Sequence, residues 1–379
     1  MKNPFVFGHL LKSESFVNRT DDIERLKNNI NNQIHTIIIS PRRWGKSSLI
    51  NLLEQKIGPT KKTVFCHMDM FNIADESDFY HQFSNQILKS TSSKMSEIMN
   101  FIKTFLKNLK PELSFEAENT GKISVNLNQQ SEKTSYMDVL NLPERIAAEK
   151  KIKLVVCIDE FQAIGRFRDS LLFQQRLRAN WQTHQNVVYI LYGSKRTMLS
   201  NLFENQDMPF YKFGDLFYMQ KIAAKHFSNF IIRSFTKTGK KITGKYAAMV
   251  LNLMENHSFY VQQFAHILWN NTNDLVNQEI FDETIINIID RNSLLFETIY
   301  GNLSISQIRV LKMIIEDKNR QYTKAENLTK YKLGSSSNVI QAFKALENKE
   351  VIDRFEGYPQ FLDPVFKLWL MKRVFKIID

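Results

Sequence analysis

The sequence predicts an α/β protein: a core built on a parallel β-sheet, then a helical lid subdomain, then a C-terminal winged-helix domain. Three observations carry this prediction. Short β-branched runs alternate with helical patterns up to about residue 220, the strand pattern then ceases, and helices followed by a hairpin begin near residue 304. The expected segments are therefore the core at 1–220, with an insertion at about 90–135, the lid at 221–300 and the winged helix at 301–379.

Composition indicates a globular protein with a preference for polyanionic partners. The chain has 379 residues, of which 43% are hydrophobic and 24% charged, and its formal net charge is +12. No apolar run is long enough to span a membrane, and the first residues contain no apolar secretory segment. We therefore expect a cytoplasmic protein with no membrane partner, in which Cys66 and Cys157 are buried thiols.

Four short runs are the expected strands of the core. The first, His35–Ser40, precedes a loop that contains one glycine and then the amphipathic helix LINLLEQKI. The other three are Thr63–Phe71, Lys153–Glu160 and Val187–Ser194, and helical patterns separate them. Strands that alternate with helices predict a parallel sheet. His67 lies within the second run and is expected to be a core histidine.

The insertion has its own pattern. A helical run ends at Pro111, and the segment SFEAENTGKISVNLNQQ then alternates apolar and polar residues around Asn119, Thr120 and Gly121. This alternation predicts a hairpin, which we interpret as an insertion lying on the main sheet.

The loop after the first strand has the pattern of a phosphate-binding loop, G-x-x-x-x-G-K-[ST], with Ser40 in place of the first glycine. Gly45 lets the backbone approach phosphate oxygens, and successive N–H groups at the start of the helix bind anions. Lys46 would reach the β- and γ-phosphates of ATP, and the Ser47 hydroxyl would bind Mg²⁺. The residues expected to surround ATP or ADP are Pro41, Arg42, Arg43, Trp44, Gly45, Lys46, Ser47 and Ser48.

Two acids end the run KLVVCIDE, and such sheets bind ligands at the carboxyl ends of their strands. Asp159 would hold Mg²⁺ through its water shell, so the metal ligands are expected to be Ser47 and Asp159. Glu160 would orient or deprotonate the attacking water, which predicts an ATPase. A strand that simply ends in two solvated acids is the alternative.

Further polar residues follow or precede the fourth strand. Ser194, in Gly193-Ser194-Lys195-Arg196, is a candidate sensor of the γ-phosphate, although a surface loop explains it as well. Arg178, and less so Arg176, is a candidate arginine finger, acting on its own nucleotide or on that of a neighbour in a homo-oligomer. A solvated helix face explains both arginines equally well. The eight histidines show no metal-binding spacing.

The pieces PRRWGKSSL and VVCIDEFQ, with FVNRTDDI, YILYGSKR and FLDPVFKLWL, resemble the archaeal-type ATPases, also found in bacteria, of the AAA+/STAND branch of P-loop NTPases. The resemblance covers nearly the whole chain. It implies that a sensor strand lies between the strands that carry the phosphate loop and the acids. It also implies that FVNRTDDI, and Arg19 in particular, lies beside the adenine. The chain departs from the family at Asn18, where glycine is usual, and at Ser258, where proline is usual.

The C-terminal segment from Ser304 reads as three helices and a hairpin with the turn Glu356-Gly357-Tyr358-Pro359, which is the order of a winged helix. Residues 301–379 contain 14 Lys and Arg and 9 Asp and Glu. Double-stranded DNA is therefore the expected partner, and docking of the winged helix on its own core is the alternative. The expected DNA contacts are Ser335, Ser337, Asn338, Gln341, Lys344 and Arg354.

These observations lead to a first hypothesis of an ATPase, slow in turnover, whose nucleotide state controls a winged helix that contacts DNA. The second hypothesis is a slow nucleotide-dependent switch or scaffold that binds a protein partner, with the winged helix as an internal lid. A third is a DNA-binding protein with a vestigial phosphate loop, whose DNA affinity would ignore nucleotide and fall steeply with salt.

Overall fold

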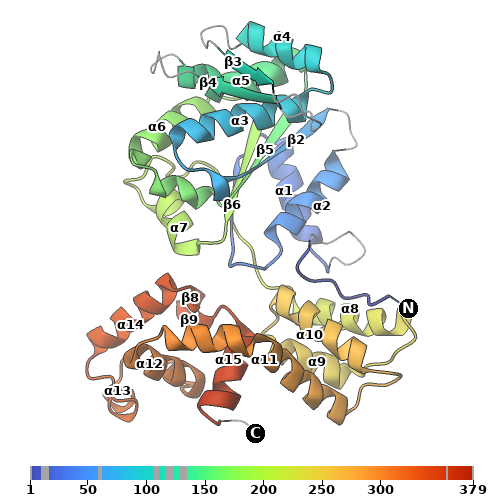
Figure 1. Cartoon of the computed structure of the whole chain (residues 1–379), viewed down its shortest axis with the longest axis vertical. Coiled ribbons are helices and arrows are strands. Elements are labelled where there is room, and N and C mark those ends of the chain that lie inside the picture. Colours follow the sequence, from blue (N-terminus) through green and yellow to red (C-terminus); the bar gives the residue numbers. More distant parts are fainter. Residues whose placement is uncertain are drawn as a thin grey trace. The chain divides into compact units, whose positions relative to one another are not determined.

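The structure is a computed structural model that describes residues 2–9, 17–58, 62–105, 111–115, 123–127, 135–355 and 357–377. It divides into two compact units (Figure 1). The sheet unit comprises Arg19–Gln220, and the helical unit comprises Met1–Asn18 together with Lys221–Asp379. Residues 1–18, assigned to the core by sequence, thus group with the helical unit. The expected turn residues Asn119, Thr120, Gly121 and Glu356 lie outside the described residues.

The sheet unit contains five parallel strands in the order β2-β5-β6-β1-β7. All residues of β1 and β6 are buried, which explains their continuous β-branched and apolar sequence. β6 lies between β1 and β5, so the predicted sensor strand does separate the two strands that end in the candidate site. The bounds are β1 (Thr36–Ile39), β2 (Thr63–Asp69), β5 (Lys153–Asp159), β6 (Val187–Gly193) and β7 (Asp215–Tyr218).

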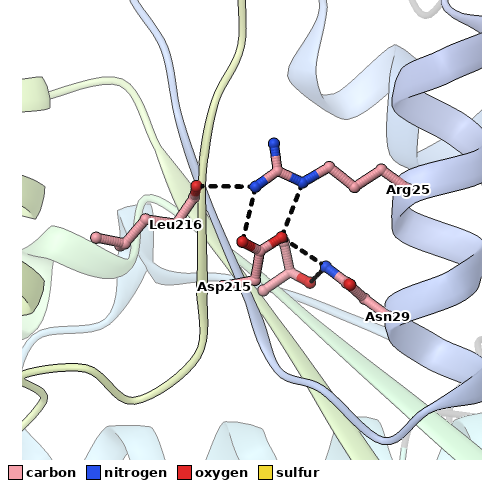
Figure 2. A network of polar contacts seen from close by, with 5 residues as sticks. Arg25, Asn29, Asp215 and Leu216 are labelled. Atoms are coloured by element: carbon pink, nitrogen blue, oxygen red, sulfur yellow. Dashed lines mark hydrogen bonds and ion pairs between the residues drawn. The ribbon is translucent and has the colours of Figure 1, made fainter.

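The edge strand β7 is joined to helix α1 (Thr20–Asn31) by a polar network at its first residue (Figure 2). Arg25 donates two hydrogen bonds to the Asp215 carboxylate, at 2.9 and 2.7 Å, and one to the Leu216 carbonyl at 3.2 Å. Asn29 donates to the same carboxylate at 2.8 Å and to the Thr36 hydroxyl of β1 at 3.0 Å. One helix therefore fixes the ends of two neighbouring strands.

Helices pack around the sheet and bury its aromatic side chains. Trp181, at the end of α6, stacks on Tyr189 of β6 with 4.1 Å between ring centroids, and both are fully buried. Phe79 and Phe173 meet edge to face at 5.0 Å. The helices are α2 (Lys46–Ile57), α3 (Glu76–Thr91), α4 (Met95–Phe105), α5 (Ser135–Lys150), α6 (Ser170–Trp181) and α7 (Arg196–Glu204), with short 3₁₀ turns η2 (Met70–Asn72) and η3 (Phe161–Arg166).

Two sequence expectations for this unit need correction. The predicted hairpin exists as the antiparallel pair β3 (Pro111–Phe115) and β4 (Ile123–Leu127), but within the described residues it pairs with no strand of the main sheet, and β4 contacts α3. His67 is not a core residue. Its side chain is 44% exposed and contacts Glu54 at 2.8 Å, because β2 is an edge strand whose alternate residues face outward.

The helical unit begins with α8 (Ala224–Lys237), α9 (Gly244–Leu253), α10 (Ser258–Asn271) and the long α11 (Gln278–Gly301). The N-terminal segment packs into this group of helices. Phe5 is 1% exposed, and its ring lies 6.0 Å from that of Phe230 and 5.5 Å from that of Phe235. The fold of the lid therefore depends on residues from the start of the chain.

The winged helix follows and shares one continuous hydrophobic core with these helices. Ser304 begins α12 with a capping box, in which its side chain and that of Gln307 exchange hydrogen bonds with each other's backbone. The expected order of three helices and a hairpin is present (Figure 1). The elements are α12 (Ile305–Glu316), α13 (Ala325–Lys330), α14 (Ser336–Asn348), β8 (Ile352–Phe355), β9 (Tyr358–Phe361), α15 (Pro364–Trp369) and the π-helical turn η4 (Leu370–Val374).

Candidate nucleotide site

The loop between β1 and α2 has a backbone shaped for anions. Gly45 has a φ of 95° and Arg43 one of 64°, both in the left-handed region. A Cβ on Gly45 would meet no atom within 4 Å, so glycine is needed there for its backbone angle rather than for space. The first N–H groups of α2, which begins at Lys46, have no partner within the helix and point toward the loop.

Lys46 is 7% exposed and its ammonium group lies among backbone carbonyls. Its Nζ donates to the carbonyl oxygens of Ser40 at 3.1 Å and Pro41 at 3.0 Å. Burial lowers the pKa of Lys46 to about 8, while the charges of Asp159 and Glu160 act in the opposite direction. Lys46 therefore remains mainly protonated at neutral pH and is available to a phosphate.

Ser40, which replaces the first glycine of the pattern, fits without strain. Its φ is not in the left-handed region, and its buried hydroxyl donates to the Pro41 carbonyl at 3.2 Å. The same hydroxyl lies 3.4 Å from Lys46 Nζ. A side chain at this position thus adds an oxygen near the lysine and displaces nothing.

The two residues predicted to bind Mg²⁺ meet in space. Ser47 Oγ donates to Asp159 Oδ2 at 3.1 Å, and the Glu160 backbone N–H donates to Asp159 Oδ1 at 2.8 Å. Burial raises the pKa of Asp159 to about 6, which a bound cation would reverse. Hydroxyl and carboxylate oxygens suit Mg²⁺, which binds few protein groups besides substrate phosphates. Among the described residues no group of three His, Cys, Asp or Glu side chains forms a separate metal site.

Glu160 has a φ of 50° and caps the 3₁₀ turn η3. Its Oε2 accepts a hydrogen bond from Ser194 Oγ at 3.0 Å, and Ser194 Oγ accepts one from Arg42 Nε at 3.3 Å. The phosphate loop, the acid and the candidate sensor are thereby connected. The same Oε2 accepts a hydrogen bond from Gln162 Nε2. Sequence reasoning missed Gln162, although its position two residues after Glu160 was the available clue.

The remaining predicted nucleotide residues differ in exposure. Pro41, Trp44 and Ser48 are buried, whereas Arg42 and Arg43 are exposed. Arg19 is not on the phosphate loop. The residue is 7% exposed, and its guanidinium donates from one nitrogen to Asp22, at 3.0 Å, and to the Gln220 carbonyl, at 2.7 Å.

Arg178, the candidate finger, has a structural role in this chain. Its guanidinium donates to the carbonyls of Pro209 at 2.7 Å and Tyr211 at 2.6 Å and so holds the loop before β7. Arg176 pairs with Glu76 and lies over the Tyr136 ring. Neither contact supports a finger, which stays a prediction.

A pocket of about 270 Å³ lies in the helical unit. An aromatic ring, two amides, an imidazole and a guanidinium line it. These residues are Val17, Asn18, His226, Asn229, Phe230 and Arg233.

Among the described residues, no helix is long and apolar enough to cross a bilayer.

The predicted DNA contacts lie at the exposed start and outer face of α14. Ser335, Ser337, Asn338, Gln341 and Lys344 are all exposed. Ser335 caps the helix by accepting from the Asn338 N–H at 3.3 Å, and its hydroxyl lies 2.9 Å from that of Ser337. Arg354, on β8, pairs with Glu347 at 2.6 Å.

Two family models match the chain, and they match different parts of it. Residues 9–165 match the family described as "Predicted AAA-ATPase", and residues 294–372 match the "Probable winged helix domain". No curated protein matches the chain.

Solved structures with the same fold include the Walker-type ATPase PABY2304 of Pyrococcus abyssi, with 15% identity, coverage of 95% of this chain and 97% of that one, and a TM-score of 0.63. The ORC2 protein of Aeropyrum pernix, solved as ADPNP–ADP complexes, has 11% identity, 98% coverage of both chains and a TM-score of 0.55. The ORC1 protein of Aeropyrum pernix in complex with DNA has 10% identity, 100% coverage of both and a TM-score of 0.50. The protein therefore joins a P-loop, AAA-ATPase-like domain to a C-terminal winged-helix domain.

Proposed function

We propose that the protein binds ATP with Mg²⁺ at the phosphate loop and hydrolyses it to ADP and phosphate. One observation carries the proposal: the Asp159 carboxylate at the end of β5 accepts hydrogen bonds from the Ser47 hydroxyl of α2 and from the Glu160 N–H, and the charges of Asp159 and Glu160 act on the buried Lys46 ammonium. A cation, a hydroxyl and two acids at the start of a helix are the parts that phosphoryl transfer needs.

Each side chain has a distinct role in this proposal. The Lys46 ammonium, now held by carbonyls, exchanges those contacts for the β- and γ-phosphate oxygens. Ser47 Oγ and Asp159 would hold Mg²⁺, which would neutralise charge on the phosphates. Glu160 orients a water molecule whose oxygen bonds to the γ-phosphorus while the bond from phosphorus to the bridging β,γ-oxygen breaks. A proton of that water is then released by way of the carboxylate.

Ser194 would report the γ-phosphate. Its hydroxyl now donates to Glu160. We propose that a γ-phosphate attracts the same hydroxyl, together with Arg42, and so changes the contacts of the catalytic carboxylate. The nucleotide would in this way set the state of the loop that follows β6.

Arg19 stays a predicted neighbour of the adenine. Its second guanidinium nitrogen is buried and has no hydrogen-bond partner among the described residues.

For the winged helix we propose contact with double-stranded DNA through α14. Its predicted contacts are exposed, and the start of a helix with hydroxyl and amide side chains can reach both phosphates and base edges.

The alternative, a slow switch that binds a protein partner with the winged helix as a lid, is favoured by one observation. Arg178 is occupied by the carbonyls of Pro209 and Tyr211, so the chain offers no free finger at that position.

ATP hydrolysis by the wild type and by Glu160→Gln, with and without duplex DNA, tests the proposal. We expect the mutant to bind ATP normally and to hydrolyse it at least about 100-fold more slowly. Equal rates for the two proteins would refute hydrolysis at this site. Stimulation by DNA would support the DNA proposal, and indifference to DNA would favour the protein-binding switch.

A further inference from the structure

Gln162 is a buried amide beside the catalytic carboxylate. It lies in η3, is 3% exposed, and donates from Nε2 to Glu160 Oε2. Its Oε1 is buried and has no hydrogen-bond partner among the described residues, so the bond from Nε2 to Glu160 is the one that offsets the cost of burying the amide. This contact joins a buried amide to a half-buried carboxylate.

Glu160 is held at one oxygen only. Ser194 Oγ and Gln162 Nε2 both donate to Oε2, and within the described residues no donor reaches Oε1. Two donors on Oε2 fix the plane of the carboxylate. Oε1 then remains the acceptor for a water molecule.

Gly193, at the end of the neighbouring strand β6, provides the space for the amide. A Cβ on Gly193 would lie 2.9 Å from Cδ of Gln162 and still closer to its Oε1, well inside van der Waals contact. The φ of Gly193 is not in the left-handed region, so its backbone angle does not require glycine. The absence of a side chain at 193 is therefore explained by the position of Gln162.

We propose that Gln162 is a positioning residue for ATP hydrolysis, which aims the Glu160 carboxylate at water, and that Gly193 is glycine in order to admit it. This inference rests on the proposed hydrolysis. Gln162 does not touch the nucleotide in this scheme and acts only through Glu160. It follows that Gln162 affects the chemical step and leaves the affinity for ATP unchanged.

The first test is kinetic. Gln162→Leu keeps the bulk of the side chain and removes the donor, so we expect kcat to fall by roughly tenfold or more, with KM and the Kd for ATP unchanged. Gln174→Leu is the matched control, because Gln174 is a buried glutamine (1% exposed) on α6 that donates to Ser170. We expect this control to lower stability without lowering kcat.

A cycle with Glu160→Asp separates positioning from general damage. The aspartate side chain is shorter by one methylene, so its carboxylate no longer reaches the Gln162 amide. In this background Gln162→Leu should therefore lower kcat little further. An equal loss of kcat in both backgrounds, or a wild-type kcat for Gln162→Leu while Glu160→Gln is impaired, would overturn the positioning role. Equal rates of ATP hydrolysis by the wild type and by Glu160→Gln would refute the proposed function itself, and this inference would fall with it.

The second test needs no activity. Gly193→Ala should lower Tm by at least about 2 °C in the wild type and by much less in a Gln162→Ala background, where the clash is absent. If Gly193→Ala does not fold alone, recovery of a folded protein by the double substitution gives the same answer. An equal fall in Tm in both backgrounds would show that Gln162 does not occupy the space beside Gly193.

Discussion

The proposed phosphate site, formed by Lys46, Ser47, Asp159 and Glu160, differs from the outer face of α14 in how its polar side chains are bonded. In the phosphate site the functional groups are half-buried or buried and bonded to one another before any ligand binds: Lys46 to carbonyls, Ser47 to Asp159, and Glu160 to Ser194. On α14 the candidate groups are exposed, and the hydrogen bonds of Ser335 and Asn338 are made to residues close to them in the sequence. The first region is organised in advance for a ligand, whereas the second gains its contacts only from a partner.

This difference predicts unequal effects of mutation. A side chain in an organised, poorly hydrated site contributes strongly to binding, because its charge is little screened. A side chain on an exposed helix contributes modestly and in a manner that depends on salt. The tests below run from the largest expected effect to the smallest.

Lys46→Ala should weaken ATP-Mg²⁺ binding by roughly 100-fold, since it removes charged hydrogen bonds worth about 1.5–3 kcal/mol. Titration calorimetry measures this effect. Lys56→Ala is the control, because Lys56 is an exposed lysine near the end of the same helix. Normal ATP binding by Lys46→Ala would mean that this loop is not the phosphate site, and the contrast with α14 would then have no basis.

A second buried polar cluster makes the sheet unit sensitive to acid. Burial lowers the pKa of His35 to about 4 and that of His184 to about 4. His184 Nδ1 lies 3.0 Å from the Tyr189 hydroxyl, and His35 Nδ1 accepts from the Tyr189 N–H at 3.2 Å. Glu144 is the nearby acid and raises the pKa of His184, although burial outweighs it.

Since both folded pKa values lie below the unfolded value of 6.5, the unfolded chain binds more protons between pH 6.5 and 4. The stabilisation is thus complete above about pH 6.5 and is lost as the pH falls toward 4. At pH 5 each histidine should reduce the free energy of unfolding by on the order of 1–2 kcal/mol. Urea unfolding at pH 7.5 and pH 5 measures the loss, and His184→Gln should reduce it. An equal loss between pH 7.5 and pH 5 in the wild type and in His184→Gln would contradict the burial of a neutral His184.

On α14, Lys344→Ala should weaken duplex DNA binding by several-fold at most and lower the slope of log affinity against log salt by about one. Fluorescence anisotropy at several salt concentrations measures both. Lys245→Ala removes the same charge from an exposed position on α9 and should leave the slope unchanged. Identical behaviour of the two variants would make α14 an ordinary solvated face and favour the winged helix as a lid.

The smallest effect is expected for Arg354→Ala. Its pair with Glu347 is 2.6 Å long, but the arginine side chain is 47% exposed. Exposed pairs contribute about 0–1 kcal/mol, so thermal unfolding should change by no more than a few degrees. A fall in Tm as large as that of a core substitution would show that the Arg354–Glu347 pair is held rigidly despite its exposure, as the polar groups of the phosphate site are.

Much of the phosphate site was predictable because its pattern is local. Gly45, Lys46 and Ser47 are consecutive, and the run ending at Asp159 and Glu160 is a continuous apolar strand. The meeting of Ser47 with Asp159 followed from the rule that parallel strands end at one edge. The place of β6 between β1 and β5 was implied by a family resemblance, because no residue pattern specifies which strand lies beside which. The fifth strand, β7, was not predicted.

What the sequence did not predict depends on contacts between distant residues. Nothing in the sequence around Gln162 or Gly193 indicates that the Gln162 side chain fills the space left by the missing side chain of Gly193. Phe5 has no periodic neighbours to place it among the lid helices. The strand pattern of residues 114–130 predicted a hairpin but could not indicate its packing partner, because the alternation is the same on a sheet and on a helix.

The discontinuous helical unit has a consequence for synthesis. Phe5 leaves the ribosome long before Phe230 and Phe235, and the entire sheet unit is translated between them. During that interval Phe5 lacks its native partners, and the core of the helical unit is completed only after α8 has emerged. The order of translation therefore allows the sheet unit to fold before the helical unit does.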